Sequence, residues 1–171
     1  MTPDTPGVSL EFVRKKVAGA LKRLLMEDAA LIRGDVNERS ITHHLAIYLK
    51  RRFPGWDVDV EYNRNLGDIK RLCMNPPQPT AEDTNAVTVY PDVIVHRRDK
   101  TENLLVVEVK KAGRCNIDFD IEKLGTFTDK PPGGLGYMWG VHVVLPALPE
   151  GQPVQCWFAG GVKLDVGQPQ P

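Results

Sequence analysis

Two apolar, β-branched runs that follow each other closely place the strongest constraint on the fold of this chain. They cover residues 87–96 (VTVYPDVIVH) and 104–110 (LLVVEVK), and the polar segment RRDKTEN joins them. Runs of this composition are typical of strands that lie well inside a sheet, and the short polar link favours a hairpin. We therefore predict a central β-hairpin.

Each run of this hairpin carries a carboxylate near its middle, Asp92 in the first and Glu108 in the second. If the hairpin is centred on Lys100, Asp92 faces Glu108 across the strands, although a bulge at Pro91 would shift that register by one. Two carboxylates about 5 Å apart repel by about 3 kcal/mol at an effective dielectric near 20. A shared proton or a divalent cation such as Mg²⁺ must therefore neutralise them. Lys110 lies on the same face as Glu108, because side chains alternate along a strand.

The remaining pattern predicts an α/β fold with a mixed β-sheet flanked by helices. Helical spacing predicts helices over 9–32, ending at Gly34, and over 36–53, and a further helix from Ile117 to about Thr128. Alternation and β-branched content predict further strands over 56–62, 136–145 and 154–159, and residues 63–86 form a long polar connection. The strand, helix, strand order over 104–145 implies a parallel pair. With 171 residues, the chain suits one domain, 1–171, with flexible ends at about 1–8 and 161–171.

Charge and cysteine content narrow the class of protein. The 22 basic and 22 acidic side chains cancel, so that a nucleic-acid partner needs a local basic surface. Residues 97–114 hold six Lys or Arg against three acids, which suits either a phosphate-facing patch or a solvated hairpin tip. Three scattered cysteines indicate reduced thiols, and neither a leader nor a long apolar run is present. We expect a soluble, cytoplasmic protein without membrane contact.

The hairpin motif resembles a known family. Pro91-Asp92, fifteen intervening residues and then Glu108-Val109-Lys110 match the P-D…E-x-K pattern of the PD-(D/E)XK, or restriction-endonuclease-like, superfamily. The expected element order over 36–160 also resembles that family's αβββαβ core, here with an extra N-terminal helix. By this resemblance Asp92, Glu108 and the carbonyl of Val109 bind the metal, and Lys110 positions or polarises the attacking water.

The resemblance implies a Mg²⁺-dependent phosphodiesterase, an endo- or exonuclease that hydrolyses nucleic acid, with DNA the expected substrate and Mn²⁺ a substitute ion. A homodimer would explain double-strand cleavage. The alternative within the same fold is a catalytically silent subunit that binds nucleic acid or protein partners. A structural salt bridge among Asp92, Glu108 and Lys110 is the alternative reading of the motif itself.

Supporting residues follow from the same comparison. Glu38 lies in line with the apolar stripe of its helix and resembles a helix glutamate that many members place beside the metal; a capping box with Asp35 as N-cap is the alternative. Three basic residues are expected to contact phosphates, with a solvated loop as the alternative for the first two: Arg64, Lys70 and Lys111. Asp118, Asp120 and Lys123 resemble a D-x-x-K-L helix of small nuclease-like relatives, but we predict that they serve helix capping and surface pairing.

Overall fold

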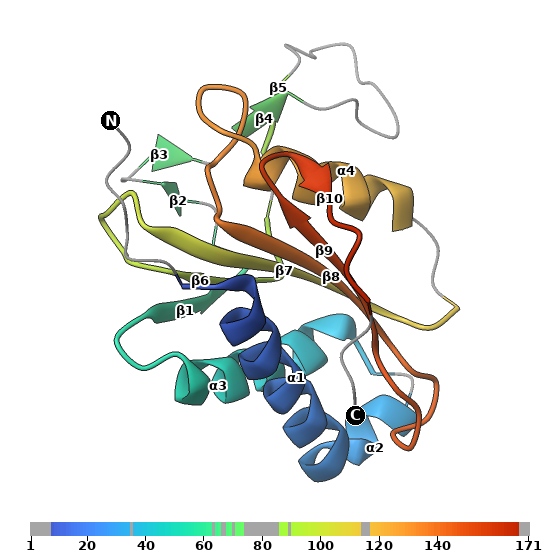
Figure 1. Ribbon diagram of the computed structural model, residues 1–171. Coiled ribbons are helices and arrows are strands. Elements are labelled where there is room, and N and C mark those ends of the chain that lie inside the picture. The colour runs from blue at the N-terminus through green and yellow to red at the C-terminus, as the bar shows by residue number, and fades with distance from the viewer. Residues whose placement is uncertain are drawn as a thin grey trace.

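The computed structural model describes residues 8–34, 36–62, 90–113 and 117–167, together with the backbone of the short strands within 64–65, 68–69, 71–73 and 86–88. A six-stranded sheet forms the middle layer, with α4 on one face and α1, α2 and α3 on the other (Figure 1). The chain is therefore an α/β domain with a mixed, helix-flanked sheet, as predicted. Among the described residues, no helix combines the length and apolar character that crossing a membrane requires.

The first predicted helix is two helices, α1 (Leu10–Glu27) and α2 (Ala29–Arg33). Ser9 caps α1 by accepting a hydrogen bond from Phe12 N at 3.2 Å, and Gly34 ends α2, both as the sequence indicates. Asp28 separates the two helices, and its backbone is not helical. Its carboxylate accepts a hydrogen bond from the hydroxyl of Tyr48 at 2.6 Å, which favours this break in the helix. The contact between Asp28 and Tyr48 of the neighbouring helix thus interrupts a helix that the apolar spacing predicts as continuous.

The second predicted helix is α3 (Glu38–Arg52). Its N-cap is Asn37, whose side chain accepts a hydrogen bond from Arg39 N at 3.0 Å. Glu38 is consequently the first helical residue, not the third, so the alternative capping box built on Asp35 is wrong. The Glu38 side chain is therefore free of a capping role and can contact other elements.

The large sheet has the strand order β1-β6-β7-β8-β9-β10. Its members are β1 (Asp57–Val60), β6 (Val93–His96), β7 (Asn103–Lys111), β8 (Trp139–Leu145), β9 (Val154–Ala159) and β10 (Val162–Lys163). Among the described strands only β7 and β8 pair in parallel, and α4 (Ile117–Thr128) connects them, as the strand, helix, strand pattern predicts. The stretch expected to be a flexible end from 161 onward contains β10.

The predicted strand over 87–96 is divided at Pro91. Its first part forms β5 (Ala86–Thr88), which pairs with β4 (Arg71–Cys73) in a separate two-stranded sheet, and its second part is β6. Proline lacks the N–H that a continuous ladder needs, so strand pairing stops there. The long connection also contains a second small pair, β2 (Arg64–Asn65) with β3 (Asp68–Ile69). The bulge expected near Pro91 lies at the other end of β6, between Val95 and His96.

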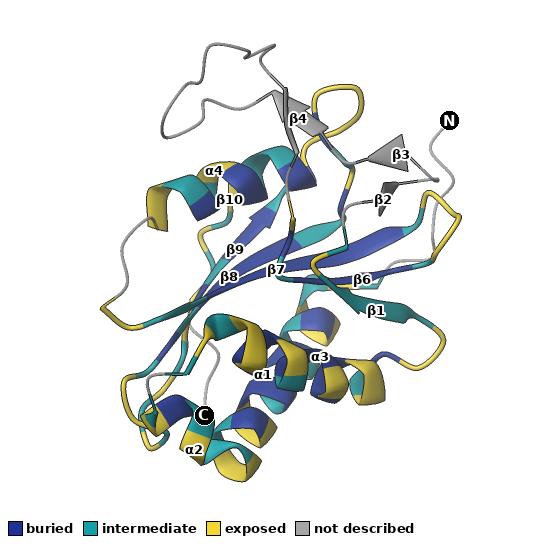
Figure 2. Cartoon of the chain, turned by 180° about the vertical axis from the view of Figure 1, so that it is seen from behind, coloured by how far each residue is buried: buried dark blue, intermediate teal, exposed yellow. Residues whose placement is uncertain are grey.

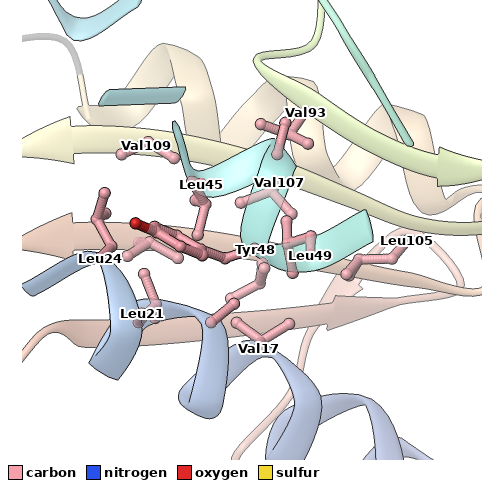
Figure 3. Close-up of a cluster of buried hydrophobic side chains, with 14 of the residues drawn as sticks. Val17, Leu21, Leu24, Leu45, Tyr48, Leu49, Val93, Leu105, Val107 and Val109 are labelled. Atoms are coloured by element: carbon pink, nitrogen blue, oxygen red, sulfur yellow. The ribbon is translucent and has the colours of Figure 1, made fainter. Parts of the chain in front are cut away.

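Two apolar clusters lie on the two faces of the sheet. The larger one packs α1 and α3 against β6, β7, β8 and β9, and Figure 3 shows side chains such as Leu21, Leu45 and Val107 meeting there. The smaller one lies under α4 and contains Ile94, Val106, Leu124, Phe127, Tyr137 and Phe158. Figure 2 shows the central strands buried and the outer surfaces of the helices exposed.

Gly140 sets the approach of α4 to the sheet. A Cβ atom at this position would lie 2.9 Å from Thr128 Cγ2 and 3.2 Å from Leu124 Cδ2, both on α4. Because such contacts are shorter than side chains tolerate, only glycine lets the helix lie this close. The close approach carries the polar residues of α4 to the hairpin.

Candidate active site

The facing pair predicted from the hairpin is present. β6 and β7 pair Val93 with Val107, so one step further along both strands Asp92 stands opposite Glu108. This register is centred on Lys100, as expected. Ile94 and Val106 pack in the cluster under α4, which places Asp92, Glu108 and Lys110 on that same face.

Asp92 is half-buried and tied to the opposite strand. Its Oδ2 accepts a hydrogen bond from Val109 N at 2.8 Å, so the carboxylate replaces a backbone acceptor just before β6 begins. Burial raises the pKa of Asp92, and the Val109 hydrogen bond opposes that rise. A residue in a strand directs its N–H and C=O to the same side, so the carbonyl of Val109 is also turned toward Asp92.

Glu108 is the most deeply buried of the motif residues, at 1% exposed. Its Oε2 lies 2.6 Å from Lys123 Nζ, while its Oε1 is buried and has no hydrogen-bond partner. Burial, followed by the negative charge of Asp92, raises the pKa of Glu108 to about 8, although Lys123 counteracts both. A buried carboxylate oxygen without a partner is unusual and favours a proton or a cation at this point.

Asp120 and Lys123 belong to the site, which corrects the prediction that they serve capping and surface pairing. They are 3% and 9% exposed and lie one helical turn apart on the side of α4 that faces the sheet. Oδ1 of Asp120 lies 3.2 Å from Lys123 Nζ. The signal was their helical spacing with Leu124 and Phe127, which places a charge pair on a buried stripe.

Lys110 lies between two carboxylates from different elements. Its Nζ is 3.3 Å from Asp120 Oδ2 and 3.5 Å from Glu38 Oε2. Burial alone would lower the pKa of Lys110, but the charges of Asp120, Glu38 and Asp92 raise it above its ordinary value. Lys110 therefore carries its positive charge at neutral pH.

Glu38 reaches this group from the first turn of α3. Besides its contact with Lys110, its Oε1 accepts a hydrogen bond from Lys111 N at 3.3 Å. The structure thus brings Glu38 beside the E-x-K segment, as expected for a helix acid that points at the sheet.

Sequence reasoning missed His142. It lies on β8 opposite Glu108 in the parallel register, is 2% exposed, and places Nε2 3.8 Å from Asp120 Oδ2. Burial lowers the pKa of His142, so the ring is neutral at neutral pH. The sequence contains no motif that predicts His142 beside Glu108, because their proximity depends on the register between β7 and β8.

No observed side-chain contact gathers the three predicted phosphate-contacting residues at this site. Lys111 points away from α4, and its Nζ donates to the carbonyl of Gly34 at 2.5 Å, which joins the end of β7 to the end of α2. Arg64 belongs to β2, of which the structure describes only the backbone, and Lys70 lies outside the described residues.

The charges of the site do not balance. Four carboxyl groups, on Glu38, Asp92, Glu108 and Asp120, surround two ammonium groups, on Lys110 and Lys123, so that negative charge is in excess once Glu108 has lost its proton. Within the described part of the chain, no three His, Cys, Asp or Glu side chains form a cluster of the kind that holds a metal by itself. Mg²⁺ is commonly held by one or two carboxylates, with waters and substrate phosphates completing its shell, so that the pair Asp92 and Glu108 still suits this ion.

Comparisons with known proteins add no family to this picture. Searches against protein-family models, curated proteins and solved structures found no match to this chain.

Proposed function

We propose that this chain is a Mg²⁺-dependent nuclease of the PD-(D/E)XK type, which hydrolyses phosphodiester bonds in nucleic acid, with DNA as the substrate. One observation carries the proposal: Asp92 and Glu108 occupy facing positions on one side of the sheet, with Lys110 beside them. The element order α3, β1, β6, β7, α4, β8, with the short strands β2 to β5 inserted between β1 and β6, supports the restriction-endonuclease-like αβββαβ core that this function implies.

The donor set fits the proposed ion. The Asp92 and Glu108 carboxylates and the Val109 carbonyl are hard oxygen ligands of the kind that Mg²⁺ and Mn²⁺ take. The orphaned Oε1 of Glu108 and the excess of carboxylates support a cation there. When bound, the ion would polarise the phosphodiester and lower the pKa of a coordinated water.

Lys110 acts as a fixed positive charge in this proposal. Neighbouring carboxylates raise the pKa of Lys110, which favours an ammonium group that orients the attacking water by donating a hydrogen bond and stabilises the anionic transition state. Asp120 and Glu38 hold its ammonium group in place through the contacts at 3.3 and 3.5 Å. These two acids position Lys110.

A catalytically silent subunit of the same fold is the second candidate, and one observation favours it. Lys123 already supplies Glu108 with a cation at 2.6 Å, inside the protein. A permanent internal ion pair at the metal-binding carboxylate would turn this site into a structural element, and the chain would then act by binding nucleic acid or a protein partner.

Cleavage assays with matched variants test the proposal. The wild-type chain is incubated with plasmid, single-stranded DNA and RNA in Mg²⁺, Mn²⁺ or EDTA, beside Asp92→Asn, Glu108→Gln and the exposed control Glu122→Gln on α4. We expect metal-dependent cleavage by the wild type and the control, and a loss of about a hundredfold or more in the two site variants.

Circular dichroism verifies that each variant remains folded. Absence of cleavage by the wild type on all three substrates, or full activity in Glu108→Gln, would overturn the nuclease proposal. Nucleic-acid binding without cleavage, together with no heat of Mg²⁺ binding that depends on Asp92, would establish the silent subunit instead.

A further inference from the structure

The helical layer on the other face of the sheet is strongly basic. Residues 8–53, which include α1, α2 and α3, hold ten Lys or Arg and five Asp or Glu, in a chain whose total charge is zero. Arg33 and Arg39 pair with Glu150 and Glu61 from outside this layer. The remaining excess of basic residues gives the layer a positive field in solution. Seven of the ten basic residues are exposed, and Figure 2 shows that the exposed residues of these helices lie on their outer surfaces.

Within this layer a hollow of about 290 Å³ lies between α1 and α3. Four residues line it: Arg23, Tyr48, Arg51 and Arg52. We call it the arginine pocket. Its volume is at the low end of ligand pockets and suits a small group rather than a large apolar molecule.

Arg52 is seated in this pocket by a glycine. A Cβ atom at Gly19 in α1 would fall well inside van der Waals contact with the guanidinium of Arg52. The guanidinium therefore lies directly on the backbone of α1, at the one kind of residue that leaves room for it. Helix interiors disfavour glycine by about 1 kcal/mol relative to alanine, so a glycine at position 19 is not explained by helix formation.

The two carboxylates that contact Arg23 and Tyr48 already have partners. Glu27 pairs with Arg23, and Asp28 accepts a hydrogen bond from the Tyr48 hydroxyl and lies 3.1 Å from His44 Nδ1. The hydrogen bond to Asp28, with burial, raises the pKa of Tyr48 to about 12, so this hydroxyl remains protonated. These acids balance their own partners and leave the rest of the pocket positive.

Arg51 and Arg52 differ from Arg23 because no carboxylate compensates their charge in the described part of the chain. Arg51 lies 5.8 Å from the centre of the Tyr48 ring, and Figure 3 shows that ring among the buried side chains of the core. In the part of the chain that the structure describes, neither arginine makes an ion pair with a carboxylate. The end of α3 carries only about half a negative charge from its dipole, which a single cation neutralises. Arg51, Arg52 and Lys50 lie in this last turn, so the helix end carries more positive charge than its dipole needs.

We propose that the arginine pocket is a binding site for a phosphate group, either free or carried by a nucleic-acid strand. Guanidinium groups match tetrahedral oxyanions through paired hydrogen bonds, and a phosphate here would supply the negative charge that Arg51 and Arg52 lack. The site lies across the sheet from Glu108 and needs no metal, so that it is independent of the proposed nuclease activity.

Titration of the full chain in EDTA tests this site. The probes are inorganic phosphate and pyrophosphate by calorimetry, and a labelled single-stranded oligonucleotide by anisotropy. Arg52→Gln removes a guanidinium from the pocket, and Lys22→Gln, on the exposed side of α1, removes one charge outside it. We expect Arg52→Gln to weaken binding of pyrophosphate about tenfold or more, and Lys22→Gln to change it less than about twofold.

Gly19→Ala provides a test that unfolding cannot mimic. The added methyl displaces the flexible end of Arg52 while it favours the helix, so we expect unchanged or higher thermal stability with binding weakened as in Arg52→Gln. Competition between pyrophosphate and the oligonucleotide identifies a strand phosphate as the ligand; binding of pyrophosphate alone identifies a free phosphate compound. Absence of binding by every probe, or equal losses in Lys22→Gln and Arg52→Gln, would overturn the proposal.

Discussion

Lys123 Nζ lies 2.6 Å from Oε2 of Glu108, in the buried layer between α4 and the sheet. This pair joins the helix to the hairpin through charge rather than through apolar contact. Breaking a buried ion pair from one side leaves the other charge without compensation, which is costly. The stability of the fold and the chemistry of the site therefore depend on the same few atoms.

Replacement of Lys123 by methionine should destabilise the protein by about 3 kcal/mol at pH 8. Methionine fills a similar volume but leaves the Glu108 carboxylate buried without its cation. The loss should be smaller at pH 5, where Glu108 binds a proton instead. Urea denaturation at the two pH values measures the difference.

The double variant Lys123→Met/Glu108→Gln should recover much of that loss, because no buried charge remains. Lys130→Met, at an exposed lysine after α4, serves as the control and should change stability by less than about 0.5 kcal/mol. Equal and additive losses in the single and double variants would show that the two side chains do not interact.

The stability of the metal-free protein should fall as the pH rises from about 5 to 8. The pKa of Glu108 is raised to about 8 in the folded chain, so the folded state binds its proton more tightly than the unfolded state does. That contribution is fully present below the unfolded pKa and is lost as the pH passes through the folded value. Asp92, whose pKa burial also raises, changes in the same direction.

Glu108→Gln should flatten this pH profile and reduce the loss of stability between pH 5 and pH 8.5 by on the order of 3 kcal/mol. Denaturant titrations in EDTA at pH 5, 6.5 and 8.5 provide the measurement. Glu122→Gln, at an exposed position on α4, should retain the wild-type slope. A variant profile as steep as the wild-type one would contradict the burial of an ionisable Glu108.

Asp92→Asn and Asp92→Ala should differ in stability by about 1 to 2 kcal/mol. Asparagine keeps an oxygen that can accept the Val109 N–H, which now binds Oδ2 at 2.8 Å, whereas alanine leaves that donor unpaired. Both variants lose the negative charge and should lose any Mg²⁺ binding. Thermal melts and calorimetric Mg²⁺ titrations of the same samples separate the two roles; equal melting temperatures would exclude the hydrogen-bonding role.

Asn37→Ala should cost about 1 kcal/mol of stability, while Glu38→Gln should cost less than about 0.5 kcal/mol. The cap of α3 is made by Asn37, and Glu38 contacts Lys110 and Lys111 instead. In a cleavage assay the order should reverse, with Glu38→Gln the more harmful change. A larger stability loss in Glu38→Gln would restore a capping role for that residue.

The hairpin could be predicted from sequence because its information is local. Alternation along β7 fixes which residues share a face, and the short link to β6 fixes the register that places Asp92 opposite Glu108. The division of 87–96 at Pro91 was not predicted as a change of sheet. The partner of β5 is a distant strand, β4, which no local pattern identifies.

The contribution of α4 was missed for a different physical reason. Asp120 and Lys123 are usual surface residues of a helix, and their burial depends on acids and bases that other elements supply. His142 joins the group only through the parallel register of β7 and β8. Likewise, the arginine pocket requires Gly19 of α1 and Arg52 of α3 to meet, which follows from helix packing and not from spacing along the chain.

Gly140 gives this arrangement a consequence for redesign. The layer spacing under α4 depends on a hydrogen atom where other residues carry a side chain, since a Cβ there would meet Thr128 and Leu124. A larger residue at position 140 would push α4 away from the sheet. Lys123 would then move away from Glu108, although neither of these two residues had been altered. A redesign of the site on this sheet face must therefore keep glycine at position 140 before it replaces any of the charged residues.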